Sequence, residues 1–253
     1  MKILSLGAGV QSTTLLLMAV RGEIERPDHA IFADTQDEPA AVYRHLETLK
    51  VAAEGAGIGF HTVTAGKLSS SVLRISKRTV SIPSYGDRGG MSRRQCTREF
   101  KVAPITKKVR ELVGARPYQR LAVGVAEMWI GISLDEVQRM KMNRDRWITN
   151  RWPLIEKRMT RHDCLRWLKA NGYGEPEKSA CVYCPYHDNA TWRRMKMAGS
   201  AEWAEAVRVD RELNERGEYL HRSLKSLDQV DFSNDTDRGQ TTFDAECEGM
   251  CGV

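Results

Sequence analysis

Residues 2–21 read KILSLGAGVQSTTLLLMAVR: an apolar run, a loop of small residues and a second apolar run. Residues 2–6 have the length and composition of a short buried strand. The glycines at 7–11 predict a tight loop, and 12–21 predict a helix with its leucines turned inward. A strand, a glycine loop and a helix in this order direct backbone N–H groups to a helix N-terminus, which favours anions.

The same alternation of elements continues along the chain. We expect further strands at 28–33, 60–64 and 121–125, and helices at 39–54 and 104–112. Strands that alternate with helices predict a doubly wound α/β fold with a parallel sheet and right-handed crossovers. Ligands of such a sheet bind at the carboxyl ends of its strands. Residues 69–90 are rich in glycine, serine and arginine and predict a long loop or insertion.

Composition excludes several classes of protein. The chain has 253 residues, of which 41% are hydrophobic and 28% charged, so it is neither fibrous nor of low complexity. It has no apolar run of the length that spans a membrane, and we expect no secretory signal at its N-terminus. Six cysteines are too few and too unevenly spaced for a disulfide scaffold. We therefore expect a cytoplasmic protein whose clustered cysteines serve metal or redox chemistry.

The net charge of +6 is concentrated in two segments. Eight basic residues and one acid lie between 88 and 110, and ten basic residues and three acids lie between 139 and 169. Such segments suit polyanions, although solvated helix faces have the same composition. Tryptophans that could stack on bases are interleaved with these arginines, although a position in the core is the alternative for each: Trp129, Trp147, Trp152, Trp167 and Trp192. DNA or tRNA is therefore the expected macromolecular partner, and no membrane partner is expected.

Several separate stretches resemble the PP-loop ATP pyrophosphatases, especially their phosphoadenosine phosphosulfate (PAPS) reductase-like branch. SLGAGVQST at 5–13 looks like the family's S-G-G-x-D-S loop, and FADTQDEP at 32–39 looks like its D-T-G-x-x-x-P segment. CTREFKVAP at 96–104 is similar to its C-x4-K-x2-P stretch. Further matches follow in the family's order over about residues 1–190: Gly131 to Arg139, Pro153-Leu154, Asp163 and CVYCP at 181–185.

The resemblance implies an adenine nucleotide alpha hydrolase-like fold that binds ATP with Mg²⁺. It gives the phosphates to the first loop and the ribose or adenine to Asp34, for which a helix N-cap is the alternative role. Gln11 stands where sulfur-inserting members usually carry Asp, and Gln36 replaces a Gly. The residues that the resemblance places around the nucleotide are Ser5, Gly7, Gly9, Val10, Gln11, Ser12, Thr13 and Asp34.

Two cations are carried over by the same resemblance. Arg139 is expected to face the phosphates, and Lys101 is the second catalytic cation. Charge that develops on a leaving pyrophosphate needs preorganised donors, and arginine offers two parallel N–H groups. A solvated surface position is the alternative for each residue.

Three cysteines have the spacing of metal ligands. Cys181 and Cys184 form a C-x-x-C pair, and Cys96 lies in a basic segment as a third thiol. With the family order C…C-x-x-C-P, the resemblance implies a [4Fe–4S] cluster on these three residues that leaves one iron without a cysteine. The alternatives are structural zinc with His187 as fourth ligand, or no metal.

The remaining cysteines have other expected roles. Cys164 lies in a helical stretch and is expected in the core. Glu246-Cys247 partly resembles the Glu-Cys-Gly setting of the catalytic thiol in PAPS reductase-like enzymes, so Cys247 could relay sulfur or electrons as a thiolate. An unreactive tail is the alternative for Cys247 and Cys251.

These observations predict three parts: a nucleotide-binding α/β domain (1–150), a helical, cluster-bearing part (151–227) and an acidic, cysteine-containing tail (228–253). The expected activity is adenylation of a nucleic-acid site with release of pyrophosphate, followed by sulfur transfer as in DNA phosphorothioation or tRNA thiolation. A cysteine desulfurase is a candidate sulfur donor, and a homodimer is compatible with the sequence. The alternatives are a PAPS or adenylyl-sulfate reductase that releases sulfite through a C-terminal cysteine, and a nucleic-acid-binding module without turnover.

Overall fold

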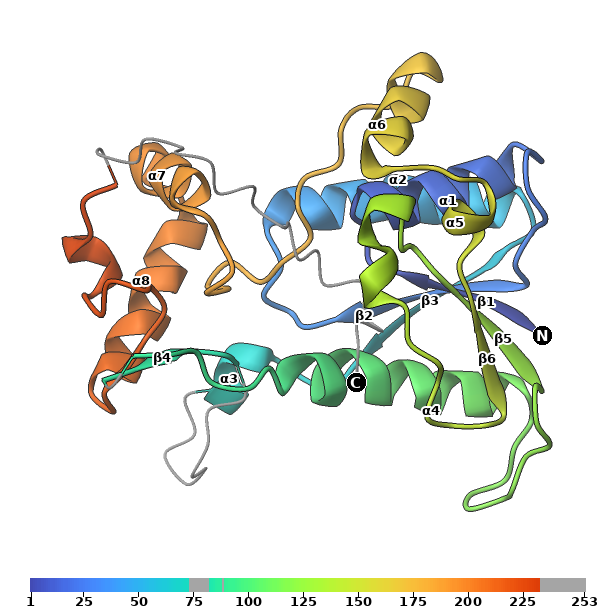
Figure 1. Ribbon diagram of the computed structural model, residues 1–253, viewed down its shortest axis with the longest axis horizontal. Helices are drawn as coiled ribbons and strands as arrows, with labels where there is room; N and C mark the ends of the chain where they lie inside the picture. The colour runs from blue at the N-terminus through green and yellow to red at the C-terminus, as the bar shows by residue number, and fades with distance from the viewer. Residues whose placement is uncertain (73–81, 88, 233–253) are drawn as a thin grey trace.

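A five-stranded parallel sheet forms the centre of the molecule, in the order β3-β2-β1-β5-β6. The computed structural model describes residues 1–72, 82–87 and 89–232. The chain passes from β1 outward to β2 and β3 and then returns to the other side of β1 with β5. The order therefore reverses beside β1, which is where an open α/β sheet binds its ligands (Figure 1). The strands are β1 (Lys2–Leu6), β2 (His29–Asp34), β3 (Gly59–Thr64), β5 (Ala126–Ile130) and β6 (Ile148–Arg151).

Helices cover both faces of this sheet. Leu4 and Leu6 alternate with Ile3 along β1, so the two leucines pack on one face and the isoleucine on the other. The leucine face lies under three helices, α1 (Val10–Val20), α2 (Ala40–Gly55) and α6 (Arg161–Ala170). The opposite face is covered by α4 (Ala103–Leu112), below the sheet in Figure 1. The predicted α/β class with a parallel sheet is confirmed.

A second hydrophobic core lies beside the sheet and is mainly helical (Figure 1). Trp192 and Leu213 are fully buried in it. It also takes Leu68 and Phe100 from the N-terminal half of the chain. Its elements and the remaining short ones are α3 (Leu68–Val72), β4 (Tyr85–Gly86), the π-helical turn η1 (Thr97–Val102), η2 (Leu134–Arg139), α5 (Pro153–Glu156), α7 (Asn189–Ala198), α8 (Ala201–Asn214), β7 (Glu218–Tyr219) and η3 (Leu227–Gln229).

The predicted strand at 121–125 is wrong, because β5 begins at Ala126. Val123 is 70% exposed, and Gly124 has a φ of +71°, so this apolar stretch forms a turn at the surface. The buried strand residues come later, at Met128 and Ile130. The strand was missed in the sequence because the charged Glu127 interrupts the apolar run of its five residues.

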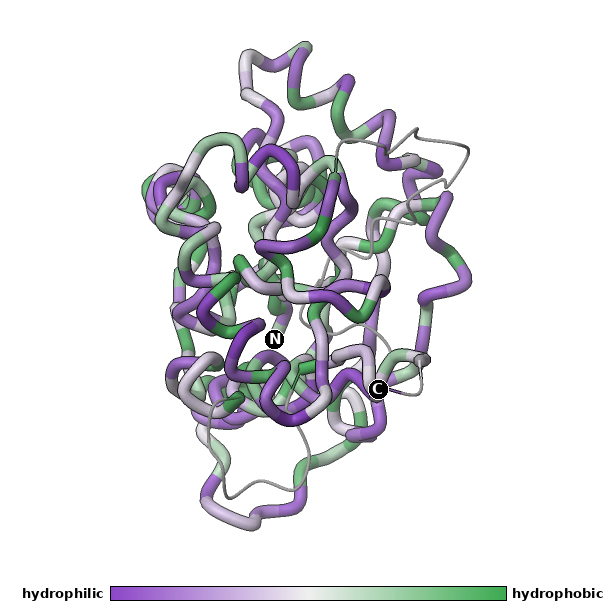
Figure 2. The backbone as a smooth tube through the Cα atoms, turned by 90° about the vertical axis from the view of Figure 1, so that its left-hand side faces the viewer, coloured by the Kyte–Doolittle hydropathy of each residue, from purple (hydrophilic) through white to green (hydrophobic). Residues whose placement is uncertain are grey.

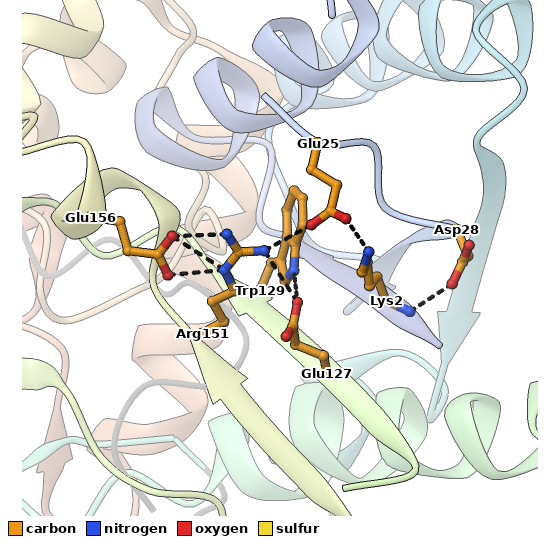
Figure 3. Close-up of polar contacts among 7 residues, drawn as sticks. All are labelled: Lys2, Glu25, Asp28, Glu127, Trp129, Arg151 and Glu156. Carbon is orange, nitrogen blue, oxygen red and sulfur yellow. Dashed lines mark hydrogen bonds and ion pairs between the residues drawn. The ribbon is translucent and has the colours of Figure 1, made fainter. Parts of the chain in front are cut away.

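A polar cluster explains why Glu127 occurs in a strand (Figure 3). Its carboxylate accepts a hydrogen bond from Trp129 Nε1 at 2.6 Å and lies 3.4 Å from Arg151 of β6. The same guanidinium contacts Glu25 at 3.1 Å and Glu156 at 2.9 Å, and its Cζ lies 5.1 Å from the Trp129 ring centroid. Arg151 therefore fastens the edge strand β6 to β5 and to the loop after α1.

Helix α1 is buried from Val10 to Ala19, whereas α2, α4, α6 and α8 each bury one face. Figure 2 shows hydrophobic and hydrophilic residues that alternate closely along the chain. Within the described ranges, no helix is long and apolar enough to cross a membrane.

Candidate functional site

The loop at residues 7–9 joins β1 to α1 at the point where the strand order reverses. Gly7 N–H donates to Ser12 Oγ at 3.2 Å, and this hydroxyl donates to Gly9 O at 3.4 Å. Ala8 has a φ of +59°, which makes the turn tight. No side chain caps α1, and its first turn contains no acid, so the N–H groups there suit an anion.

The predicted nucleotide-binding residues of the loop share this environment, and all of them are buried. Thr13 Oγ1 lies 3.0 Å from His45 Nε2, which ties the first turn of α1 to α2. Burial lowers the pKa of His45, so its imidazole is neutral at pH 7. Ser5 lies in β1, two residues before Gly7. Its buried hydroxyl has no hydrogen-bond partner in the described part of the chain.

Gln11 is the centre of a charged network over the loop. Arg161 donates to Gln11 Oε1 at 3.1 Å, and Gln11 Nε2 donates to Glu136 Oε2 at 3.0 Å and to Ser133 Oγ at 3.5 Å. Arg139 forms an ion pair with the same Glu136. The structure therefore brings the predicted residues Gln11 and Arg139 together through Glu136, and it adds the cation of Arg161.

Asp34 ends β2 at the same edge of the sheet. Its carboxylate accepts hydrogen bonds from Tyr43 Oη at 2.9 Å and from the backbone N–H of Gln36 at 2.7 Å. Burial and this carboxylate raise the pKa of Tyr43, so the phenol stays a donor. Gln36 has a φ of +61°, the left-handed conformation that glycine adopts most easily. The N-cap of α2 is Pro39, so Asp34 does not have that alternative role.

The three predicted metal ligands line one small cavity of about 30 Å³ with Lys101. Cys96 directly precedes η1, whereas Cys181 and Cys184 lie in the segment before α7. Cys181 Sγ lies 3.3 Å from the hydroxyl of Thr35, directly after β2. Burial raises the pKa of the Cys181 thiol, so this thiol is protonated in the absence of a compensating positive group.

Residues 35–38 connect the sheet with the segment that carries the C-x-x-C pair. Lys101 Nζ lies 3.3 Å from Glu38 Oε1, and both side chains are buried. Ser179 Oγ donates to Glu38 Oε2 at 3.3 Å. Tyr183 Oη donates to Asp37 Oδ2 at 2.8 Å. Lys101 is therefore placed at the thiol cavity, not in the network around Gln11.

The thiols do not stand in a closed coordination shell. In the residues that the structure describes, no group of three or more His, Cys, Asp or Glu side chains could hold a metal ion as placed. His187 directs Nε2 to the backbone oxygen of Cys181 at 3.0 Å, and its buried Nδ1 has no partner among these residues. Burial lowers the pKa of His187 to about 4, so its imidazole is neutral at pH 7.

Other predicted residues have simpler outcomes. Cys164 is fully buried, which confirms its core position. Trp129, Trp147 and Trp192 are buried as well, which is the core position left open for them and removes these three rings from base stacking. Their rings fill the hydrophobic cores, which offers a larger gain in free energy than surface exposure. Cys247 and Cys251 lie outside the described residues.

Sequence reasoning missed several residues that contact the predicted ones. Glu136 and Arg161 bind Gln11, and Glu38 pairs with Lys101. Glu136 and Glu38 lie inside the quoted segments 131–139 and 32–39, which was the available signal. No family model and no curated protein matches this chain, so the functional argument depends on the geometry of the site.

Proposed function

We propose that the chain binds ATP at residues 7–13, adenylates an oxygen of a nucleic acid with release of pyrophosphate, and supports replacement of that oxygen by sulfur. The observation that carries this proposal is the placement of the loop. The loop lies where the strand order reverses, and Asp34 ends the neighbouring strand. Arg161 contacts Gln11 of the loop, and Arg139 pairs with Glu136 beside it. A triphosphate needs this combination of backbone N–H groups and cations.

The proposed reaction has two steps, adenylation of the acceptor oxygen and displacement of AMP by sulfur. The acceptor oxygen attacks the α-phosphorus of ATP, and the bond to the bridging oxygen breaks, so pyrophosphate leaves. A sulfur nucleophile then attacks the atom that bears the adenylated oxygen, and AMP leaves with that oxygen. In this scheme the loop N–H groups and the Ser12 hydroxyl bind the phosphates, and Arg139 and Arg161 stabilise charge on the leaving group.

Mg²⁺ would neutralise the phosphates, and Glu136 supplies a carboxylate for it. Gln11 offers only an amide, which binds Mg²⁺ more weakly than a carboxylate does. Glu136 Oε2 lies 3.0 Å from the Gln11 amide, so an acid is present beside the loop although the loop itself lacks one. This placement supports ATP chemistry.

A [4Fe–4S] cluster is the group that we propose for Cys96, Cys181 and Cys184. Thiolates are the ligands of such clusters, and these three thiols line one cavity. Lys101 lines the same cavity, where its positive charge is paired with Glu38. An iron without a protein ligand can bind sulfide or substrate. The cavity is small, so loading requires its lining side chains to move apart.

The cofactor is tested by metal and sulfide analysis of anaerobically purified protein. We expect iron and acid-labile sulfide in equal amounts, and a loss of both in the Cys181→Ser variant. Cys164→Ser is the matched control, because this buried thiol lies in another core. Stoichiometric zinc without sulfide would contradict the cluster.

The reaction is tested by anaerobic incubation with ATP and PAPS together, in the presence of DNA, tRNA, sulfide and a thiol reductant. Chromatography of the nucleotides is expected to show AMP and pyrophosphate. Adenosine 3′,5′-bisphosphate with sulfite would instead support the reductase, the second candidate, which the amide of Gln11 in the loop favours. The cytoplasmic location, a desulfurase partner, homodimerisation and the role of Cys247 stay predictions.

A further inference from the structure

A groove lined by described residues lies away from the nucleotide loop. It has a volume of about 510 Å³ and runs between α4 and the crossover segment that leads to β6. Five cations and a single acid, Asp145, are among the residues that line it. The cations are Arg98, Lys107, Arg110, Lys141 and Arg144. The two basic segments of the sequence, 88–110 and 139–169, therefore meet in this groove.

The helical wall of the groove is fixed by the core. Ala103, Thr106, Lys107 and Arg110 recur at intervals of three or four residues and so lie along one face of α4. The adjoining face carries Ile105 and Val109, which are buried against the sheet. The cations thus project from a helix that cannot rotate without loss of core packing.

The opposite wall is held by β6. Asn150 of that strand donates to the carbonyl of Lys141 at 2.9 Å and accepts from the Asn143 side chain at 3.2 Å. Asn143 in turn accepts from the backbone N–H of Asp145 at 2.9 Å. These hydrogen bonds give the crossover segment a defined conformation, so this wall of the groove is structurally fixed.

The charges in the groove are largely uncompensated. Arg98, Lys107 and Arg144 are exposed, and no ion pair between described residues involves any of them. Arg110 donates to the carbonyl of Gln119 at 2.8 Å, and its Cζ lies 5.6 Å from the Trp147 ring centroid. A row of such cations attracts a polyanion and gives no electrostatic attraction to a neutral ligand.

We propose that this groove binds single-stranded nucleic acid through its phosphates. From Arg98 to Arg110 the helical segment extends at most about 18 Å, which is enough to contact several phosphates of one strand. A volume of about 510 Å³ is enough for part of one sugar-phosphate strand and is too small to enclose a duplex. The inference names the acceptor of the proposed reaction and in that respect rests on it.

The groove is continuous in sequence with the thiol cavity. Arg98 and Lys101 both belong to η1, which follows Cys96 directly. Arg98 lines the groove, whereas Lys101 lines the cavity. One short helical segment therefore contributes side chains both to the groove and to the thiol cavity.

The test is fluorescence anisotropy of the full chain with a labelled twelve-nucleotide strand, as DNA and as RNA, and with a duplex, all at 50 mM salt without ATP. The double variant Lys107→Gln with Arg144→Gln removes two groove cations. Lys50→Gln with Lys169→Gln removes the same charge from α2 and α6. We expect the groove variant to bind roughly 10- to 100-fold more weakly and to lower the salt slope by about 1.4, since each single-strand contact contributes about 0.7.

Equal weakening in both variants, or none in the groove variant, would overturn the assignment, and so would tighter binding of duplex than of either single strand. ATP binding by the same proteins separates this inference from the proposed function. If the groove cations are needed for strand binding but the protein does not bind ATP, the groove assignment stands and the ATP reaction is rejected. ATP turnover with groove-independent strand binding would reject the groove alone.

Discussion

At the scale of single residues, the buried pair Glu38 and Lys101 is the most consequential charge interaction of the site. Both side chains are almost fully buried, at 0% and 7% exposure. Loss of one partner leaves the other charge without compensation, which costs about 3–5 kcal/mol for a buried pair. Glu38→Ala should lower the free energy of unfolding by this amount in urea. Glu54→Ala, an exposed control, should cost under about 0.5 kcal/mol; similar losses for both variants would contradict the interpretation.

Individual site residues were predictable only where a local motif contains them. The cysteines and the glycines of the loop stand in recognisable spacings. Glu136 and Arg161 do not, because they reach Gln11 across 125 and 150 positions of sequence. A contact over such a separation depends on the folded sheet and leaves no local pattern.

At the scale of elements, α6 begins with a capping box. Thr160 Oγ1 accepts from the N–H of Asp163 at 3.2 Å, and Asp163 Oδ2 accepts from the N–H of Thr160 at 2.9 Å. Thr160→Ala should cost about 1 kcal/mol in the free energy of unfolding, as measured by urea denaturation. Thr48→Ala, in the middle of α2, should cost nothing because alanine favours helix. A loss in Thr48→Ala as large as in Thr160→Ala would show that the cap is not the cause.

The same cap predicts a pH dependence. Hydrogen bonds from Thr160 lower the pKa of Asp163 below its usual 3.8. The folded pKa lies below the unfolded one, so the stabilisation is present above about pH 4 and is lost as the pH falls toward the folded value. Thermal unfolding midpoints between pH 6 and pH 2 should fall more steeply for the natural protein than for Asp163→Asn. Parallel curves would exclude the cap as a source of acid sensitivity.

Elements with simple burial were predicted well, and those with polar interruptions were not. The first strand, loop and helix agree with the structure to within about two residues, because their apolar runs are continuous. The strand β5 was displaced in the prediction, since Glu127 interrupts it for the sake of Arg151. The strand β6 has only four residues, and η1 has a π-helical form that no spacing rule anticipates.

At the scale of the whole molecule, a hydrogen bond between Tyr183 and Asp37 helps to join the segment after β2 to the helical core. Tyr183 donates to Asp37 at 2.8 Å, and burial raises the pKa of this phenol, so it stays protonated. Tyr183→Phe should lower the free energy of unfolding by about 1–3 kcal/mol, because Asp37 loses a buried donor. Tyr118→Phe is the matched control, as its side chain is fully exposed. Equal urea midpoints for the two variants would mean that this contact does not stabilise the junction.

The basic groove also belongs to this scale. Each basic segment was visible in the sequence, but their meeting was not. It arises because the crossover from β5 to β6 passes along α4. Sheet order, which sequence alone left open, determines that path.

The central claim is that residues 7–13 bind the triphosphate of ATP, and calorimetric titration with ATP and Mg²⁺ tests it most directly. The natural protein should bind ATP. Ser12→Ala should bind roughly 10- to 100-fold more weakly, since a hydrogen bond to a charged group contributes about 1.5–3 kcal/mol. Thr14→Val should bind as the natural protein does, because Thr14 lies beyond the loop and its hydroxyl donates to Val10 O at 2.8 Å, whereas the contact of the Ser12 hydroxyl with Gly9 O is long, at 3.4 Å. Unchanged affinity in Ser12→Ala, or no binding by the natural protein, would contradict the account.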